Sequence, residues 1–197
     1  MDEEIDNVEN DMMIESNIED IGNMVFVEKV ISYIYNISLD EDIEDPAKYR
    51  EIFNILQRAT EHDIINFYIN SHGGILVTFV QLYNLLLNCK ATTTAVIYTA
   101  HSVAALIALS CTKIIVTKFS NMMFHNSTWS VEGDSTKMKD HSDFFFESYK
   151  EILETVTRGF LTDKEIEKIM EGKEIWVNQQ NIEKRLLNRD KLLKGKK

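Results

Sequence analysis

The chain of 197 residues carries a formal net charge of −11 and is 44% hydrophobic, which allows one domain with a substantial core. One proline and seven glycines exclude collagen-like and proline-rich classes, and the acidic balance argues against nucleic acid as a main partner. Cys89 and Cys111 form no CxxC or Cys/His ligand spacing, so we expect a reducing, cytoplasmic compartment and neither a disulfide scaffold nor a bound metal.

Both ends of the chain are strongly charged. Residues 1–22 hold nine acidic side chains and no basic one, and we expect a flexible segment that could be trimmed as a propeptide or could gate an entrance. Residues 184–197 hold seven basic side chains and one acidic side chain, and we expect 191–197 to be a flexible basic tail. Residues 23–190 are expected to form the folded domain.

Between the ends, short β-branched runs alternate with helical apolar stripes, which predicts an α/β domain with a largely parallel sheet. The expected strands are 25–30, 32–37, 64–69, 92–98, 113–116 and 122–124. The expected helices are 49–60, 75–89, 102–110, 135–160, 162–172 and 182–187. Residues 91–112 carry no charged side chain, and we interpret them as a buried strand and helix rather than a membrane span.

Two places could bind or activate a substrate. Ser102 stands where a buried strand is expected to become a buried helix, so the Val103 N–H could help to hold an oxyanion; the alternative is a helix cap. The turn 70–74, Asn-Ser-His-Gly-Gly, has paired glycines that let the backbone approach a ligand; the alternative is a tight strand-to-helix turn. This turn lacks the spacing of a nucleotide-binding loop.

Among the histidines, His125 is the strongest candidate for a base. It follows the expected strand 122–124 directly, and a histidine at a strand end can accept a proton from a serine that the fold brings near. The alternative is a packed or surface histidine. His101 adjoins Ser102, but neighbouring side chains point apart and seldom pair.

Three motifs in order resemble the proteolytic subunit of Clp protease (ClpP). They are Tyr-Ile-Asn-Ser-His-Gly-Gly at 68–74, Ala-His-Ser-Val-Ala-Ala at 100–105, and Ser-Asn-Met-Met-Phe-His at 120–125. The resemblance covers about residues 24–190. It implies a crotonase-like fold of ββα units with a protruding handle helix at 135–160, and an ATP-dependent serine endopeptidase. It also implies two stacked heptameric rings, an AAA+ unfoldase that uses the ATP, unfolded polypeptide substrates, and no cofactor, membrane or nucleic acid for this chain.

The resemblance also implies roles for individual residues. The implied roles are nucleophile for Ser102, general base for His125, oxyanion-hole donors for Gly74 and Val103, and substrate contacts for Gly73 and Asn126.

The acid of the catalytic triad is the atypical position. Placing Trp176 on the family's aromatic residue puts Glu174 on the family's aspartate, whereas an ungapped reading puts Lys173 there. We prefer Glu174 as the implied catalytic acid, because Trp176 and Leu187 then both match the family. With a tryptophan at position 176, the chain resembles the phage and prophage branch of the family.

Two further departures are His72 in place of a proline and Tyr98 in place of a glycine. The altered acid position and Tyr98 leave open a catalytically silent structural subunit of a mixed ring. A further alternative is an acyl-CoA-handling relative with the same fold, which would use the paired N–H groups without a serine–histidine pair.

Overall fold

The computed structural model describes residues 30–130 and 132–195. All of the described residues from Ile31 onward belong to one compact unit. The expected flexible segment 1–22 and all but the last residue of the expected strand 25–30 lie outside the described residues.

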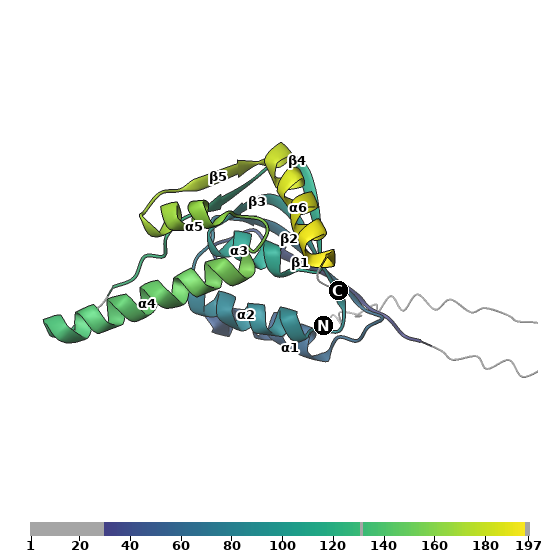
Figure 1. Cartoon of the computed structure of the whole chain (residues 1–197). Helices are drawn as coiled ribbons and strands as arrows, with labels where there is room; N and C mark the ends of the chain where they lie inside the picture. The colour runs from purple at the N-terminus through teal and green to yellow at the C-terminus, as the bar shows by residue number, and fades with distance from the viewer. Residues whose placement is uncertain (1–29, 131, 196–197) are drawn as a thin grey trace, which may run out of the picture. The chain divides into compact units, whose positions relative to one another are not determined.

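A five-stranded sheet forms the centre of this unit, and its strand order follows the chain (Figure 1). The first four strands are parallel, and the fifth is antiparallel to the fourth. The strands are β1 (Ile34–Leu39), β2 (Ile64–Ser71), β3 (Thr92–His101), β4 (Lys113–Phe124) and β5 (Ile175–Asn178).

Helices connect the strands, because parallel neighbours need a crossover between them. The helices are η1 (Pro46–Tyr49), α1 (Arg50–Arg58), α2 (Leu76–Asn88), α3 (Val103–Ser110), α4 (Ser135–Val156), α5 (Asp163–Met170) and α6 (Gln179–Lys194). In Figure 1, α1, α2 and α3 lie together on one face of the sheet. This arrangement is the mixed α/β fold that the alternation of strands and helices predicted.

Helix α3 is the centre of the core. It contains small and aliphatic side chains up to Leu109, and every residue from Val103 to Leu109 is buried. It packs against β3 and β4, so the uncharged stretch 91–112 is a buried strand followed by a buried helix. No helix in the described part of the chain is both long and apolar enough to cross a membrane. A helix packed on all sides holds its first turn rigidly against the end of β3.

Strand β4 differs from the prediction of two short strands. Its pairing with β3 shifts so that Val116 lies opposite Ile97 while Asn121 lies opposite Thr99. Four residues of β4, 117–120, therefore lie opposite a single residue of β3, Tyr98. Within this segment Phe119 has a left-handed φ of 67°. This is a bulge inside a continuous strand.

Helix α4 has an apolar excess on its solvent side. Only Tyr149, Leu153 and Val156 are buried, whereas the run 144–146 is three exposed phenylalanines. The first half of α4 extends away from the sheet in Figure 1. The helix ends at Val156, four residues earlier than predicted, and the chain then turns at Gly159, which has a φ of 77°.

The C-terminal part contains two further differences from the prediction. Strand β5 was not predicted, because four residues are too few to show a period. Helix α6 spans Gln179–Lys194 rather than 182–187, so residues 191–194, expected to belong to a flexible tail, are helical. Helix α6 packs back against β4.

Candidate active site

Ser102 occupies a sharp turn between β3 and α3. Its φ and ψ are 52° and −123°, a conformation that side chains rarely adopt and that surrounding structure must hold. The Ser102 N–H donates to the Met123 carbonyl at 2.7 Å, which pins the turn to β4. The hydroxyl makes no capping hydrogen bond to α3, so capping does not account for this serine.

His125 meets Ser102 from the neighbouring strand. Its Nε2 lies 2.8 Å from Ser102 Oγ, within hydrogen-bond distance. The backbone of His125 is held from a third element, because the Tyr149 hydroxyl on α4 donates to the His125 carbonyl at 2.7 Å. Burial raises the pKa of Tyr149, so this hydroxyl stays protonated and remains a donor.

Gly73 and Gly74 lie beside the serine in conformations that favour glycine, with φ of 103° and 147°. A Cβ on Gly73 would come within 2.7 Å of Ser102 Cβ, and a Cβ on Gly74 would overlap the backbone of Ile43. Close approach as well as conformation therefore requires glycine at both positions. The loop is anchored at Ile43, whose N–H donates to the Gly73 carbonyl at 2.6 Å.

Two backbone donors remain free beside Ser102. Within the described part of the chain, neither the Gly74 N–H nor the Val103 N–H has a protein acceptor, whereas the Gly73 N–H donates to Ser71 Oγ at 3.1 Å. Val103 is the first residue of α3, where a helix leaves its N–H groups unpaired. Both glycines, Ser102, Val103 and His125 line one open cleft. A carbonyl oxygen in this cleft could accept from both donors.

Glu174 adjoins Ile175, which lies opposite Phe124 in the β4–β5 pairing, but it makes no described hydrogen bond to His125. Its carboxylate is exposed and accepts from the Trp176 indole N–H at 2.8 Å. Its role as the third member of a triad therefore stays a prediction. Asn126 lies next to His125, but its Nδ2 donates to the Met170 carbonyl at 3.4 Å and its buried Oδ1 has no protein partner among the described residues.

Sequence reasoning missed a contact between His72 and His101. Their Nδ1 atoms are 3.1 Å apart, and His101 Nε2 is 2.5 Å from Asn121 Oδ1. His101 indeed does not pair with its neighbour Ser102, but it points across the sheet to residues that are distant in sequence. Two histidines in the first two motifs were the available signal, although only the pairing of β2 with β3 shows that they meet.

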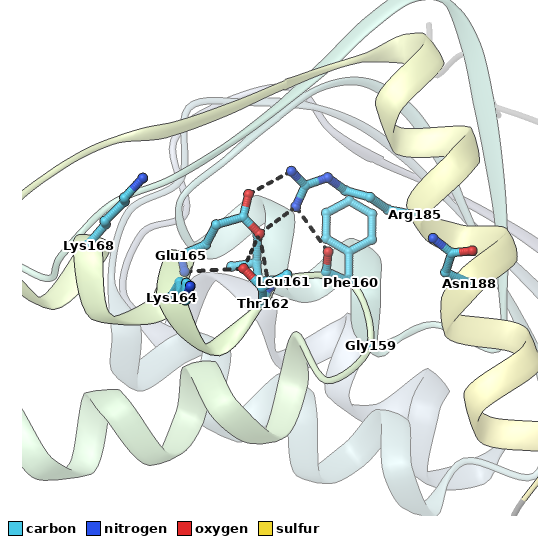
Figure 2. Close-up of a pocket in the computed structure, with 9 residues that line it drawn as sticks. All are labelled: Gly159, Phe160, Leu161, Thr162, Lys164, Glu165, Lys168, Arg185 and Asn188. Atoms are coloured by element: carbon cyan, nitrogen blue, oxygen red, sulfur yellow. Dashed lines mark hydrogen bonds and ion pairs between the residues drawn. The ribbon is translucent and has the colours of Figure 1, made fainter.

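A second hollow lies between the start of α5 and α6, and it is built around an ion pair (Figure 2). Arg185 makes two hydrogen bonds to the Glu165 carboxylate, at 2.7 and 3.0 Å, and a third to the Phe160 carbonyl. Thr162 and Glu165 cap α5 reciprocally. Because these groups satisfy one another, we assign this hollow a structural role.

A serine hydrogen-bonded to a histidine at a strand-to-helix turn, beside two free backbone donors, is the arrangement of a serine hydrolase. A family model of Clp protease matches residues 15–194. The chain therefore belongs to the Clp protease family, which supports a ClpP-like serine peptidase and confirms the family predicted from the three motifs. A search of curated proteins found no match.

Proposed function

We propose that this chain is a catalytically active serine endopeptidase subunit of the Clp type that hydrolyses peptide bonds of unfolded polypeptides. The observation that carries the proposal is the 2.8 Å contact between Ser102 Oγ and His125 Nε2 at a strained turn. Strained backbone conformations at non-glycine residues are typical of active sites, and Ser102 lines the cleft.

The proposed reaction uses residues of this chain alone. His125 Nε2 takes the proton from Ser102 as Oγ forms a bond to the peptide carbonyl carbon. The N–H groups of Gly74 and Val103 donate to the oxyanion that develops. The C–N bond then breaks, and His125 gives its proton to the leaving amine. Water, deprotonated by His125, attacks the acyl-enzyme and releases the acid product and Ser102.

A fluorophosphonate tests the site directly. Ser102 Oγ would form a bond to phosphorus, fluoride would leave, and the intact mass would rise by one phosphonyl group per chain. We expect one adduct on the unmodified protein and none on Ser102→Ala. Ser127→Ala is the matched control, because Ser127 lines the same cleft and should leave the adduct unchanged. An adduct on Ser102→Ala, or none on either protein, would refute the proposal.

Assembly and partners are part of the same proposal. The three exposed phenylalanines at 144–146 on α4 support packing against another subunit, since a monomer gains nothing by exposing them. We propose stacked heptameric rings in the cytoplasm, fed by an AAA+ unfoldase that hydrolyses the ATP. Native mass spectrometry tests the ring, and a monomeric mass would contradict it. Membership of the phage and prophage branch stays a prediction.

A second candidate is a silent structural subunit of a mixed ring. The hydrogen bond of Glu174 to Trp176, rather than to His125, favours this silent subunit. Turnover of a short fluorogenic peptide by the purified homo-oligomer separates the two candidates. Turnover that disappears in Ser102→Ala would exclude the silent subunit.

A further inference from the structure

Next to the candidate site, three side chains from separate elements form a hydrogen-bonded chain. His72, in the loop after β2, meets His101 at the end of β3 with 3.1 Å between their Nδ1 atoms. His101 Nε2 then meets Asn121 Oδ1 on β4 at 2.5 Å. His101 is only 7% exposed, and Trp176 on β5 contacts its ring edge-on with 5.0 Å between centroids.

The hydrogen-bond chemistry fixes the proton positions along this chain. An amide oxygen only accepts, so His101 Nε2 carries a proton and donates to Asn121. A neutral His101 then has a lone pair at Nδ1, and His72 must donate its Nδ1–H there. Asn121 thereby sets the tautomer of His101, and that tautomer accepts from His72.

We infer that His72 and His101 are positioning residues that hold the oxyanion loop, residues 70–74, against the turn that carries Ser102. The inference rests on the proposed function. His72 directly precedes Gly73, and His101 directly precedes Ser102, so their hydrogen bond ties together the backbones on the two sides of the site. The same two backbones approach closely, since a Cβ on Gly73 would meet the His101 carbonyl at 2.8 Å.

The loop has need of such a tie. Gly73 and Gly74 leave its backbone free to adopt many conformations, and the described hydrogen bonds of Gly73, with Ile43 and Ser71, do not reach the turn that carries Ser102. To stabilise the oxyanion, the Gly74 nitrogen must lie about 3 Å from the oxyanion's position, with its N–H directed at it. Loosening the loop would therefore weaken a bond that forms only in the transition state, which lowers kcat and leaves KM nearly unchanged.

Three variants test the inference. His72→Ala removes the donor. His72→Asn keeps one, because asparagine Nδ2 occupies the place of histidine Nδ1 relative to Cγ. His62→Ala is the control, an exposed histidine near Glu61 that takes no part in the cleft. We expect His72→Ala to lower kcat for a short fluorogenic peptide by about 10-fold or more, with KM within about threefold.

We expect His72→Asn to restore kcat to within about threefold of the unmodified protein, and His62→Ala to match it. His72 is exposed, so assembly and thermal midpoint should not change. Unchanged kcat in His72→Ala, or equal losses in His72→Ala and His72→Asn, would overturn the inference. Fluorophosphonate labelling of Ser102 distinguishes failure of this inference from failure of the proposed function. If the proposed function is wrong, the unmodified protein itself will form no adduct.

Discussion

Ser102 Oγ and His125 Nε2 are 2.8 Å apart because the pairing of β3 with β4 brings the two residues together across the sheet. The last pair in register is His101 with Met123, so Ser102 follows it by one residue and His125 by two. The candidate nucleophile and base are thus attached to the core through strand ends rather than through mobile loops. Such placement favours a geometry that is set before substrate arrives.

Substitution of Gly74 should disable the oxyanion site. In Gly74→Ala the new methyl group would overlap the Ile43 backbone, so the loop must move and carry the Gly74 N–H away. We expect fluorophosphonate labelling of Ser102 to slow by about 100-fold, the range for loss of one oxyanion donor.

Gly172→Ala is the matched control for this change. Gly172 also has a left-handed φ, of 87°, but nothing lies within 4 Å of its position for a Cβ. Gly172→Ala therefore reports the effect of backbone strain at a left-handed residue without displacement of the loop at Gly74. Equal labelling rates in both variants would show that the Gly74 N–H takes no part.

Glu174→Gln tests the acid of the triad. The alignment of motifs predicts a sharp loss of rate, whereas the structure bonds the carboxylate to the Trp176 indole. A glutamine carbonyl can accept the same N–H, so from the structure we expect kcat/KM to fall by less than about threefold. A triad acid would behave differently, since its amide replacement costs about 10⁴-fold in kcat. A loss of that order would place the carboxylate on His125 during catalysis.

The helices and strands around the site could be predicted from the sequence, because each has a recognisable pattern of neighbouring residues. The uncharged run 91–112 has room for one buried strand and one buried helix, and Ser102 falls at their junction. The alternation of strands and helices then predicted the parallel sheet. The order of the three motifs predicted the family, and through it the partnership of Ser102 with His125.

What the sequence could not show depends on the register between strands. The contact of His72 with His101 joins residues 29 positions apart and follows from how β2 pairs with β3. The bulge at residues 117–120 turned two expected strands into one, because a left-handed residue such as Phe119 has no sequence signature. The partner of Glu174 likewise depends on a side-chain conformation that spacing alone does not determine.

Asp63 should make stability depend on acid pH. Burial acts to raise the pKa of this carboxyl, but hydrogen bonds from the Thr60 N–H, the Tyr33 N–H and the Thr60 hydroxyl outweigh it and lower the pKa below its usual value. A lowered folded-state pKa means that the ionised form stabilises the fold. This contribution is complete above the unfolded-state pKa of about 3.9 and is lost as pH falls through the folded-state value.

We expect Asp63→Asn to lower the free energy of unfolding by about 1–2 kcal/mol at pH 7, and the difference from the unmodified protein to shrink toward pH 3. Glu61→Gln is the control, because the Glu61 side chain is exposed and its ion pair among the described residues is a 3.9 Å contact with the exposed His62. Thermal unfolding followed between pH 3 and 7 measures both. A difference independent of pH would contradict the assigned role of the charge.

Arg185 should stabilise the fold without affecting the candidate site. It makes two hydrogen bonds to Glu165 and donates to the Phe160 carbonyl (Figure 2). Its guanidinium carbon also lies 5.7 Å from the centroid of the Phe160 ring. Arg185→Ala would leave the carboxylate of Glu165, whose side chain is only 20% exposed, without its cation. We expect the free energy of unfolding to fall by about 1–3 kcal/mol.

The adjacent Lys184→Ala serves as the control for Arg185→Ala, because Lys184 is exposed and should change stability by less than about 0.5 kcal/mol. Fluorophosphonate labelling should proceed at the same rate in both variants, since neither residue lines the cleft of Ser102. Slower labelling in Arg185→Ala under conditions where it is fully folded would mean that the hollow between α5 and α6 influences the serine, contrary to the structural role assigned to it.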